Sequence, residues 1–219
     1  MENIVLSWSG GKDSAMTLFS VKQEAKYNVV ALLTTVNEAN NRSSMHGVRM
    51  ELVQRQAHAL GIPLDSIGLS ENCTNEEYEA KMNAAMLAYK ARGIRTVAFG
   101  DLFLEGIRRY REENLSKVGM NPIFPLWGRG TKSLLQEFLD TGHRAIITCV
   151  DTKALDKSFA GREIDAGFLF DLPAGVDPCG ENGEYHSFVF DGPMFKAPIE
   201  FKVGEKVLKR EQFYYCDIV

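Results

Sequence analysis

The sequence predicts an α/β protein in which a parallel sheet, with helices on both faces, is followed by a smaller α+β domain. In the first half of the chain, apolar runs of strand length alternate about four times with segments of helical spacing, a pattern typical of parallel sheets. A glycine-rich turn joins the first apolar run to the first helical segment. From about residue 168 onward, glycine, proline and alternating apolar residues replace that alternation, which predicts a second unit of different construction.

The elements of the first half are bounded by local signals. The apolar run at residues 29–36 is rich in β-branched residues, as expected for a strand covered on both faces. Gly61, with Pro63 just beyond it, and Gly93 are typical helix stops. We therefore expect strands at residues 4–7, 29–36, 64–69 and 96–99, and helices at residues 15–26, 48–60, 75–92 and 105–118.

The second half is less regular. Thr131 is expected to cap a helix that runs to residue 140 and stops at Gly142. Further strands are expected at residues 144–150, 188–190 and 199–203, the last two antiparallel. A change in pattern at residues 119–122 predicts a division into domains of residues 1–119 and 120–219.

Composition narrows the function classes. The chain has 219 residues and a net charge of −4, so electrostatics favours neither a nucleic-acid partner nor a membrane surface. Its apolar runs are far shorter than the roughly 20 residues of a membrane helix, and no signal peptide is visible. The four cysteines are scattered without a CxxC pair, which indicates reduced thiols. We therefore expect a cytoplasmic protein.

The glycine-rich turn is the first chemical signal. Residues 9–14 read Ser-Gly-Gly-Lys-Asp-Ser between a strand and a helix. Paired glycines let the backbone approach a ligand closely, and the helix directs free N–H groups at the same place. Ser9 and Ser14 add hydroxyl groups, Lys12 adds a mobile positive charge, and Asp13 could either cap the helix or hold a magnesium ion. The turn therefore predicts a phosphate-binding site, although it is not a Walker A loop.

A second unusual string lies near the C-terminus. Residues 180–189 read Gly-Glu-Asn-Gly-Glu-Tyr-His-Ser-Phe-Val, with two carboxylates, an amide and an imidazole close together. Such a set could hold a metal, a cationic ligand or an amine nucleophile. Alone, the string is equally consistent with a tight turn of solvated charges before a strand.

Both strings resemble known motifs. Ser-Gly-Gly-Lys-Asp-Ser resembles the signature of the PP-loop ATP pyrophosphatases, which split ATP between the α and β phosphates and pass AMP to a carboxylate or carbonyl oxygen. Residues 180–187 resemble the motif GE(G/N)GE(F/Y)xT of one member group, the diphthine–ammonia ligase family. Other segments resemble that family in order along nearly the whole chain: residues 44–46, 51–64, 100–101 with Arg109, 125–127, 158–163 and 191–196.

The resemblance implies a Rossmann-like, HUP-type sheet in residues 1–119, acting as a PP-loop ATP-binding domain, and an α+β substrate-binding domain in residues 120–219. Two residues depart from the family motif. His186 stands where many members carry Glu, and Ser187 stands where they carry Thr. These departures bear on the identity of the acceptor more than on the ATP chemistry.

The resemblance also implies roles for individual residues. The implied catalytic residues are Lys12, Asp13, Glu184 and His186, with Asp13 as a magnesium ligand. The implied ATP-binding residues are Ser9, Gly10, Gly11, Lys12, Asp13, Ser14, Thr34, Thr35, Gly100 and Asp101. The implied acceptor-binding residues are Met45, His46, Arg109, Arg162, Glu181, Asn182, Gly183 and Glu184.

The mechanism expected from this resemblance has two steps. A carboxylate of the acceptor, in the family diphthine on an elongation factor, attacks the α-phosphate of ATP while Lys12 and Mg²⁺ offset the charge of the leaving pyrophosphate. Ammonia then displaces AMP, and Glu184 or His186 removes a proton from ammonium. The expected partners are ATP, ammonia and the carboxylate acceptor. No glutaminase unit is recognisable, and the apolar C-terminal strand region would suit a homodimer.

Weaker signals and alternatives remain open at this stage. Arg108, Arg109 and Arg111 alternate with glutamates as on a solvated helix face, and Cys179 beside the second string is a minor candidate nucleophile. A helical stripe is expected to be core packing: Tyr78, Met82, Met86 and Tyr89. The alternative functions are tRNA thiolation, a non-catalytic nucleotide sensor, and the same ATP chemistry with an acceptor other than diphthine.

Overall fold

The computed structural model describes residues 1–44 and 46–219. Its first half contains β1 (Glu2–Ser7), α1 (Lys12–Gln23), β2 (Tyr27–Asn37), β3 (Arg42–Ser43), α2 (Met50–Leu60), β4 (Leu64–Leu69), α3 (Asn75–Ala91), β5 (Thr96–Ala98), α4 (Glu105–Val118) and β6 (Asn121–Ile123). The second half contains α5 (Thr131–Asp140), β7 (Arg144–Asp151), the short 3-10 helix η1 (Lys157–Phe159), α6 (Ala166–Asp171), β8 (Tyr185–Asp191), β9 (Val203–Lys209) and β10 (Phe213–Ile218).

The first sheet is parallel except for one short strand. β1 pairs with β2 on one side and with β5 on the other, β4 pairs with the far edge of β2, and β6 pairs with β5. Only the two-residue β3 runs antiparallel, at the end of β2. The chain thus moves outward from β1 in one direction and then in the other. Ligands of doubly wound sheets bind beside the strand where this reversal occurs, at the carboxyl ends.

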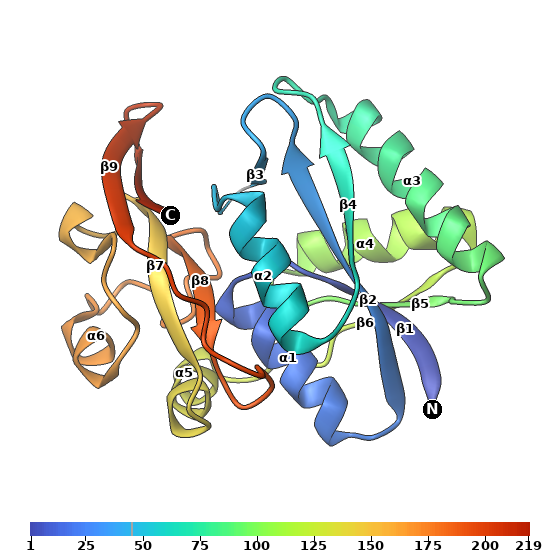
Figure 1. Ribbon diagram of the computed structural model, residues 1–219, viewed down its shortest axis with the longest axis horizontal. Coiled ribbons are helices and arrows are strands. Elements are labelled where there is room, and N and C mark those ends of the chain that lie inside the picture. Colours follow the sequence, from blue (N-terminus) through green and yellow to red (C-terminus); the bar gives the residue numbers. More distant parts are fainter. Residues whose placement is uncertain (45) are drawn as a thin grey trace.

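Helices cover both faces of this sheet, as predicted. α1 and α2 lie between the first sheet and the second sheet, whereas α3 and α4 lie on the opposite side (Figure 1). Successive side chains of β1 point to opposite faces of the sheet. Ile4 and Leu6 pack in the hydrophobic cluster that contains α1 residues, and Val5 packs in the cluster that contains α3 residues. The sequence-based α/β class is therefore confirmed.

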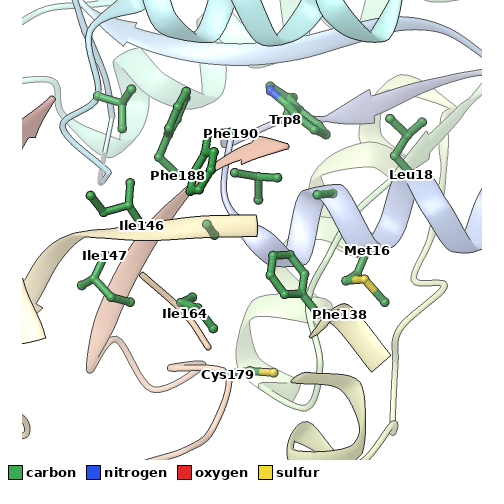
Figure 2. Packing of buried hydrophobic residues seen from close by; sticks show 14 of the residues in the cluster. Trp8, Met16, Leu18, Phe138, Ile146, Ile147, Ile164, Cys179, Phe188 and Phe190 are labelled. Carbon is green, nitrogen blue, oxygen red and sulfur yellow. The ribbon is translucent and has the colours of Figure 1, made fainter. Parts of the chain in front are cut away.

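The second sheet is antiparallel, with the order β8-β7-β10-β9. It shares one hydrophobic core with the first half of the chain. Trp8 after β1 and Met16 of α1 lie in the same cluster as Phe138 of α5, Ile146 of β7 and Phe188 of β8 (Figure 2). Because this core joins the two sheets, residues of β8 lie directly against the turn that follows β1.

Two local expectations were wrong. Gly130, and not Thr131, is the N-cap of α5, so the Thr131 side chain does not cap this helix. Residues 199–202 are not a strand, because Ile199 bonds to the backbone of Phe190 and Lys202 to that of Val219, so the backbone forms no continuous ladder with one partner. The side chains still pack inward: Ile199 is buried and the Phe201 ring lies 5.1 Å from that of Phe190. The strand begins only at Val203. The prediction also missed β10, which fills the sheet between β7 and β9.

Gln56 of α2 connects the core to the turn after β1. Its Nε2 donates to the backbone oxygens of Gly10 at 2.9 Å and Val189 at 2.6 Å, and its Oε1 accepts from Trp8 Nε1 at 3.0 Å. The side chain is completely buried. The polar groups that bond to Gln56 are satisfied by this side chain in place of water, and losing Gln56 would leave them unpaired.

We expect Gln56→Leu to lower the free energy of unfolding by about 2–3 kcal/mol, because it leaves buried polar groups without their partner. Urea denaturation followed by circular dichroism measures this. The matched control is Gln54→Leu, an exposed glutamine of the same helix. Equal midpoints for the two variants would contradict the role assigned to Gln56.

Candidate functional site

A cavity of about 480 Å³ opens at the carboxyl ends of β1, β2 and β5. Its volume falls in the usual range of small-molecule sites, about 300–1,000 Å³. Its walls come from the turn after β1, the end of β2, the segment after β5, and residues 180–187 of the second half. The structure therefore brings the two unusual strings of the sequence together around one cavity.

The turn at residues 9–14 has the shape expected of an anion-binding nest. Gly10 has φ +82°, and a Cβ there would lie 2.7 Å from the Gln56 side chain, so only glycine fits. Gly11 is the N-cap of α1 and has no side chain to cap it, but the Ser187 hydroxyl of β8 accepts from the Lys12 amide at 3.2 Å. The Ser9 hydroxyl accepts from the Gly11 amide, and the Ser14 hydroxyl donates to the Gly11 carbonyl. The start of α1 thus faces the cavity with its positive dipole end.

Lys12 is the buried cation of this turn, with only 4% of its surface exposed. Its Nζ lies 3.0 Å from Asp13 Oδ2 and 4.8 Å from the centre of the Tyr185 ring. Burial by itself lowers the pKa of Lys12, but the Asp13 carboxylate together with Tyr185 and Cys179 outweighs burial and holds that pKa above its usual range. Lys12 is therefore a permanent positive charge at the cavity wall.

Asp13 has one carboxylate oxygen free for a ligand. Its Oδ2 pairs with Lys12, whereas its Oδ1 is buried and has no hydrogen-bond partner among the described residues. An unpaired buried carboxylate oxygen is costly unless something binds it. No cluster of three metal-ligating side chains occurs in residues 1–44 and 46–219. Magnesium bound to nucleotides commonly uses one or two carboxylates plus phosphate oxygens, so Asp13 fits such an ion.

Glu181 also lines the cavity. Its Oε1 accepts a hydrogen bond of 2.7 Å from the Leu102 amide. Burial, reinforced by the negative charges of Asp13 and Asp101, raises the pKa of Glu181 to about 7. Glu181 can therefore exchange a proton with a bound reactant near neutral pH.

Glu184 lies differently from Glu181. It is buried, and its carboxylate accepts hydrogen bonds from the amide of Asp177 and from both the amide and the side chain of Asn182. Three donors hold it inside the loop, and it is not among the described residues that line the cavity. Asn182 and Gly183 of the same loop do line it. The hydrogen bonds of Glu184 therefore stabilise the conformation of the loop that carries Glu181.

Two histidines line the cavity beside Lys12. The rings of His46 and His186 are 4.7 Å apart, and His46 Nδ1 lies 3.0 Å from the Ser187 backbone oxygen. Burial lowers the pKa of His46, and burial with the neighbouring His46 and Lys12 lowers the pKa of His186 to about 3. Both rings are therefore neutral at pH 7, and His186 is a weak base.

Other residues expected in the site are divided between the cavity and the rest of the molecule. Ser9, Ser14, Thr34, Thr35, Gly100 and Asp101 line the cavity. Arg109 is exposed on α4, and Arg162 pairs with Asp171 at 2.8 Å in the second half; neither is among the described cavity residues. Met45 lies outside the described residues.

Three residues that the sequence had assigned to other environments line the cavity. Tyr78 and Met82, interpreted as core packing, and Arg111, interpreted as solvated, all line the cavity. Arg111 donates to both oxygens of Asp101, at 2.6 and 3.1 Å. A signal for Arg111 exists in the sequence, because Leu104, Arg111, Leu115 and Val118 follow the 3.6-residue period of a buried face.

Cys179 is unsuited to act as a nucleophile. Its thiol is buried and lies 3.3 Å from the Thr131 backbone oxygen, and burial raises the pKa of Cys179 to about 12. The attacking form of cysteine is the thiolate. We therefore expect Cys179→Ala to keep the turnover rate within about twofold, as measured by product release under saturating substrate. A loss of a hundredfold in a folded variant would instead restore Cys179 as a nucleophile.

The parallel sheet, with a glycine turn at its reversal point, defines a Rossmann-like α/β protein that holds its site between two units. Residues 1–122 match the family model of the diphthamide synthase N-terminal domain, and residues 130–218 match that of the diphthamide synthase C-terminal domain. The chain belongs to the diphthamide synthase family.

Curated relatives are similar over most of their length. The diphthine–ammonia ligases of Bos taurus and Homo sapiens are 28% and 27% identical to the chain, over 91% of it and 82% and 83% of their own sequences. That of Danio rerio is 28% identical over 94% of the chain and 89% of its own. The chain is therefore a member of a ligase family.

One solved structure, described as a predicted subunit of tRNA methyltransferase from Methanocaldococcus jannaschii, covers 88% of the chain and 100% of its own, at 17% identity and a TM-score of 0.43. A similarity of this size carries no functional argument. In the described residues, no helix is both long and apolar enough to cross a membrane.

Proposed function

We propose that the protein is an ATP-dependent ligase that adenylates a carboxylate, releases pyrophosphate, and converts the acyl-adenylate to an amide with ammonia. One observation supports this most directly. The buried cation of Lys12 and the unpartnered Oδ1 of Asp13 lie together at the start of α1, and a triphosphate with its magnesium ion needs such groups.

In the first step, the Lys12 ammonium and the positive dipole end of α1 bind the phosphates. The adenine lies near Thr34 and Thr35, at the end of β2. An oxygen of the acceptor carboxylate attacks the α-phosphorus, and the bond from this phosphorus to the bridging oxygen breaks. Lys12 offsets the charge that develops on the departing pyrophosphate. Magnesium, when held by Asp13, adds to this charge neutralisation.

In the second step, ammonia attacks the acyl carbon. A C–N bond forms, the C–O bond to the phosphate of AMP breaks, and the nitrogen loses a proton. Glu181 is the best-placed acceptor of that proton, because it lines the cavity and its pKa of about 7 lies near neutral pH. The geometry favours Glu181 over Glu184, which is bonded inside its loop, and over His186, whose pKa is about 3.

The acceptor proposed from family membership is diphthine on an elongation factor, bound by residues 120–219. His186 and Ser187 favour a second candidate, the same chemistry on another carboxylate. These two residues lie next to His46 and Lys12, where they would contact the reacting groups. A thiol-transfer function gains no support from the four free cysteines, of which Cys149, Cys179 and Cys216 are buried.

The deciding experiment measures AMP and pyrophosphate release from ATP with ammonium and a panel of acceptors that includes diphthine-bearing elongation factor. Equal amounts of AMP and pyrophosphate, formed only with one acceptor, would support the ligase and identify its substrate. ADP and phosphate as products would contradict the adenylation step. Tight ATP binding without turnover on any acceptor would favour a nucleotide sensor.

A further inference from the structure

Ser187 of β8 lies where the second half of the chain touches the turn at residues 9–14. Its hydroxyl accepts a hydrogen bond of 3.2 Å from the Lys12 amide, and its backbone oxygen lies 3.0 Å from His46 Nδ1. A Cβ on Gly11 would lie 3.1 Å from that backbone oxygen, so strand and turn are in close contact. Ser187 lines the main cavity although only 1% of its surface is exposed. Its hydroxyl therefore lies at the start of α1, where the phosphates are proposed to bind.

Backbone hydrogen bonds hold the strand that carries Ser187 on this turn. The Val189 amide donates to the Gly10 oxygen at 2.9 Å, and the Gln56 side chain donates to the backbone oxygens of both residues. β8 also pairs with β7 in the second sheet. Because the strand is fixed in this way, Ser187 is preorganised and can keep its bond to the Lys12 amide when a ligand binds.

The Ser187 hydroxyl has a proton left to donate. A serine hydroxyl has one proton and two lone pairs. One lone pair accepts from the Lys12 amide, and the proton has no acceptor in the part of the chain that the structure describes. Asp13 Oδ1, in the same turn, is the converse case of a buried acceptor without a donor. Both groups cost free energy while they are unpaired. A phosphate oxygen on Ser187 and a magnesium ion on Asp13 would satisfy them together.

We propose that Ser187 is a phosphate-binding residue, whose hydroxyl accepts from the Lys12 amide and donates to an oxygen of the bound triphosphate. The inference rests on the proposed function only in taking ATP as the ligand. Because Ser187 occupies the Lys12 amide, the hydroxyl is the group that transmits the polarity of this amide, and of the helix behind it, to the ligand. The second half of the chain thus supplies one donor of the phosphate site.

The first test measures affinity by isothermal titration calorimetry with magnesium but without acceptor or ammonium. We expect Ser187→Ala to weaken ATP binding by about tenfold, as for a lost hydrogen bond to a charged group, and to leave adenosine binding within about twofold. Ser187→Thr keeps the hydroxyl and should bind ATP within about threefold of wild type. Ser43→Ala is the matched control, because Ser43 is a buried serine of β3 that is not among the described cavity residues.

The second test detects the contact itself, because the loss of a helix cap alone could also weaken ATP binding. Sulfur accepts a hydrogen bond more weakly than oxygen. We therefore compare ATPαS, ATPβS and ATPγS with ATP, and test the diastereomers of the first two separately. A thiophosphate at the contacted position should weaken binding to wild type about fivefold more than binding to Ser187→Ala, since the variant has already lost the contact.

Equal thiophosphate effects in wild type and Ser187→Ala at every position would overturn the proposal and leave Ser187 as a cap of α1. Unchanged ATP affinity in a folded Ser187→Ala variant would overturn it as well. Ser187→Cys, which has a weak donor of similar size, repeats both tests if Ser187→Ala does not fold. A wild type that binds no ATP would contradict the proposed function itself, and this result is distinct from a failure of the Ser187 contact.

Discussion

Lys12→Ala is expected to lower acceptor-dependent pyrophosphate release by about 10²–10³-fold, the usual effect of removing one preorganised charge from a transition state. Lys12 is 4% exposed and is held by Asp13 and the Tyr185 ring, so its position costs no reorganisation during the reaction. The loss should fall mainly on kcat, because the charge on the leaving pyrophosphate grows during bond breaking. Steady-state kinetics at saturating ATP measures it.

Two further variants give this test its control. Lys22→Ala removes an exposed lysine of the same helix and should leave the rate within about twofold, since exposed single charges contribute little. Lys12→Arg keeps the charge but brings a larger planar group to a buried site, so it should recover only part of the activity. A Lys12→Ala enzyme that retained its kcat with a higher KM for ATP would assign Lys12 to ground-state binding alone.

Most of the fold follows from hydrophobic periodicity. Apolar runs predicted β1 and β2, a shorter apolar segment predicted β4, and the glycine stop at Gly61 correctly ended α2, with Gly61 in the left-handed conformation. The strand expected at residues 199–203 failed because alternation alone does not distinguish a strand from an irregular segment that docks on a sheet. Ile199 and Phe201 alternate inward, but they pack on β8 without joining the sheet.

The site could be predicted in part. The turn at residues 9–14 carries its chemistry within six residues, so local sequence was sufficient to find the phosphate-binding nest. The roles of Glu181 and Glu184 depend on tertiary contacts. The loop turns at Gly183, with φ +90°, and points Glu181 into the cavity while Glu184 bonds to loop amides. The prediction missed Arg111 because a charged side chain was assigned to the solvated face of the helix, although its position in the helical period places it on the inner face.

The pH dependence of amination provides the second large effect. With the pKa of Glu181 raised to about 7 by burial, the carboxylate is protonated below pH 7 and can accept a proton only above it. The amination rate, compared at equal concentrations of free ammonia, should therefore rise with pH up to about 7 and then level off. Glu181→Gln should lower the rate at pH 8 by about 10²–10⁴-fold, the typical contribution of a general base, and abolish the rise.

The Glu181→Gln substitution separates proton transfer from structure. Glutamine keeps an oxygen that can accept from the Leu102 amide, so the loop contact survives. Because the folded-state pKa of Glu181 is raised, its ionisation destabilises the wild type progressively as pH rises from about 4.5 to 7. The variant lacks this ionisation and should be no less stable than wild type at pH 8 by urea denaturation. If a folded Glu181→Gln variant keeps the pH-dependent rise, another residue must accept the proton. Glu184→Gln would then be the next variant to measure.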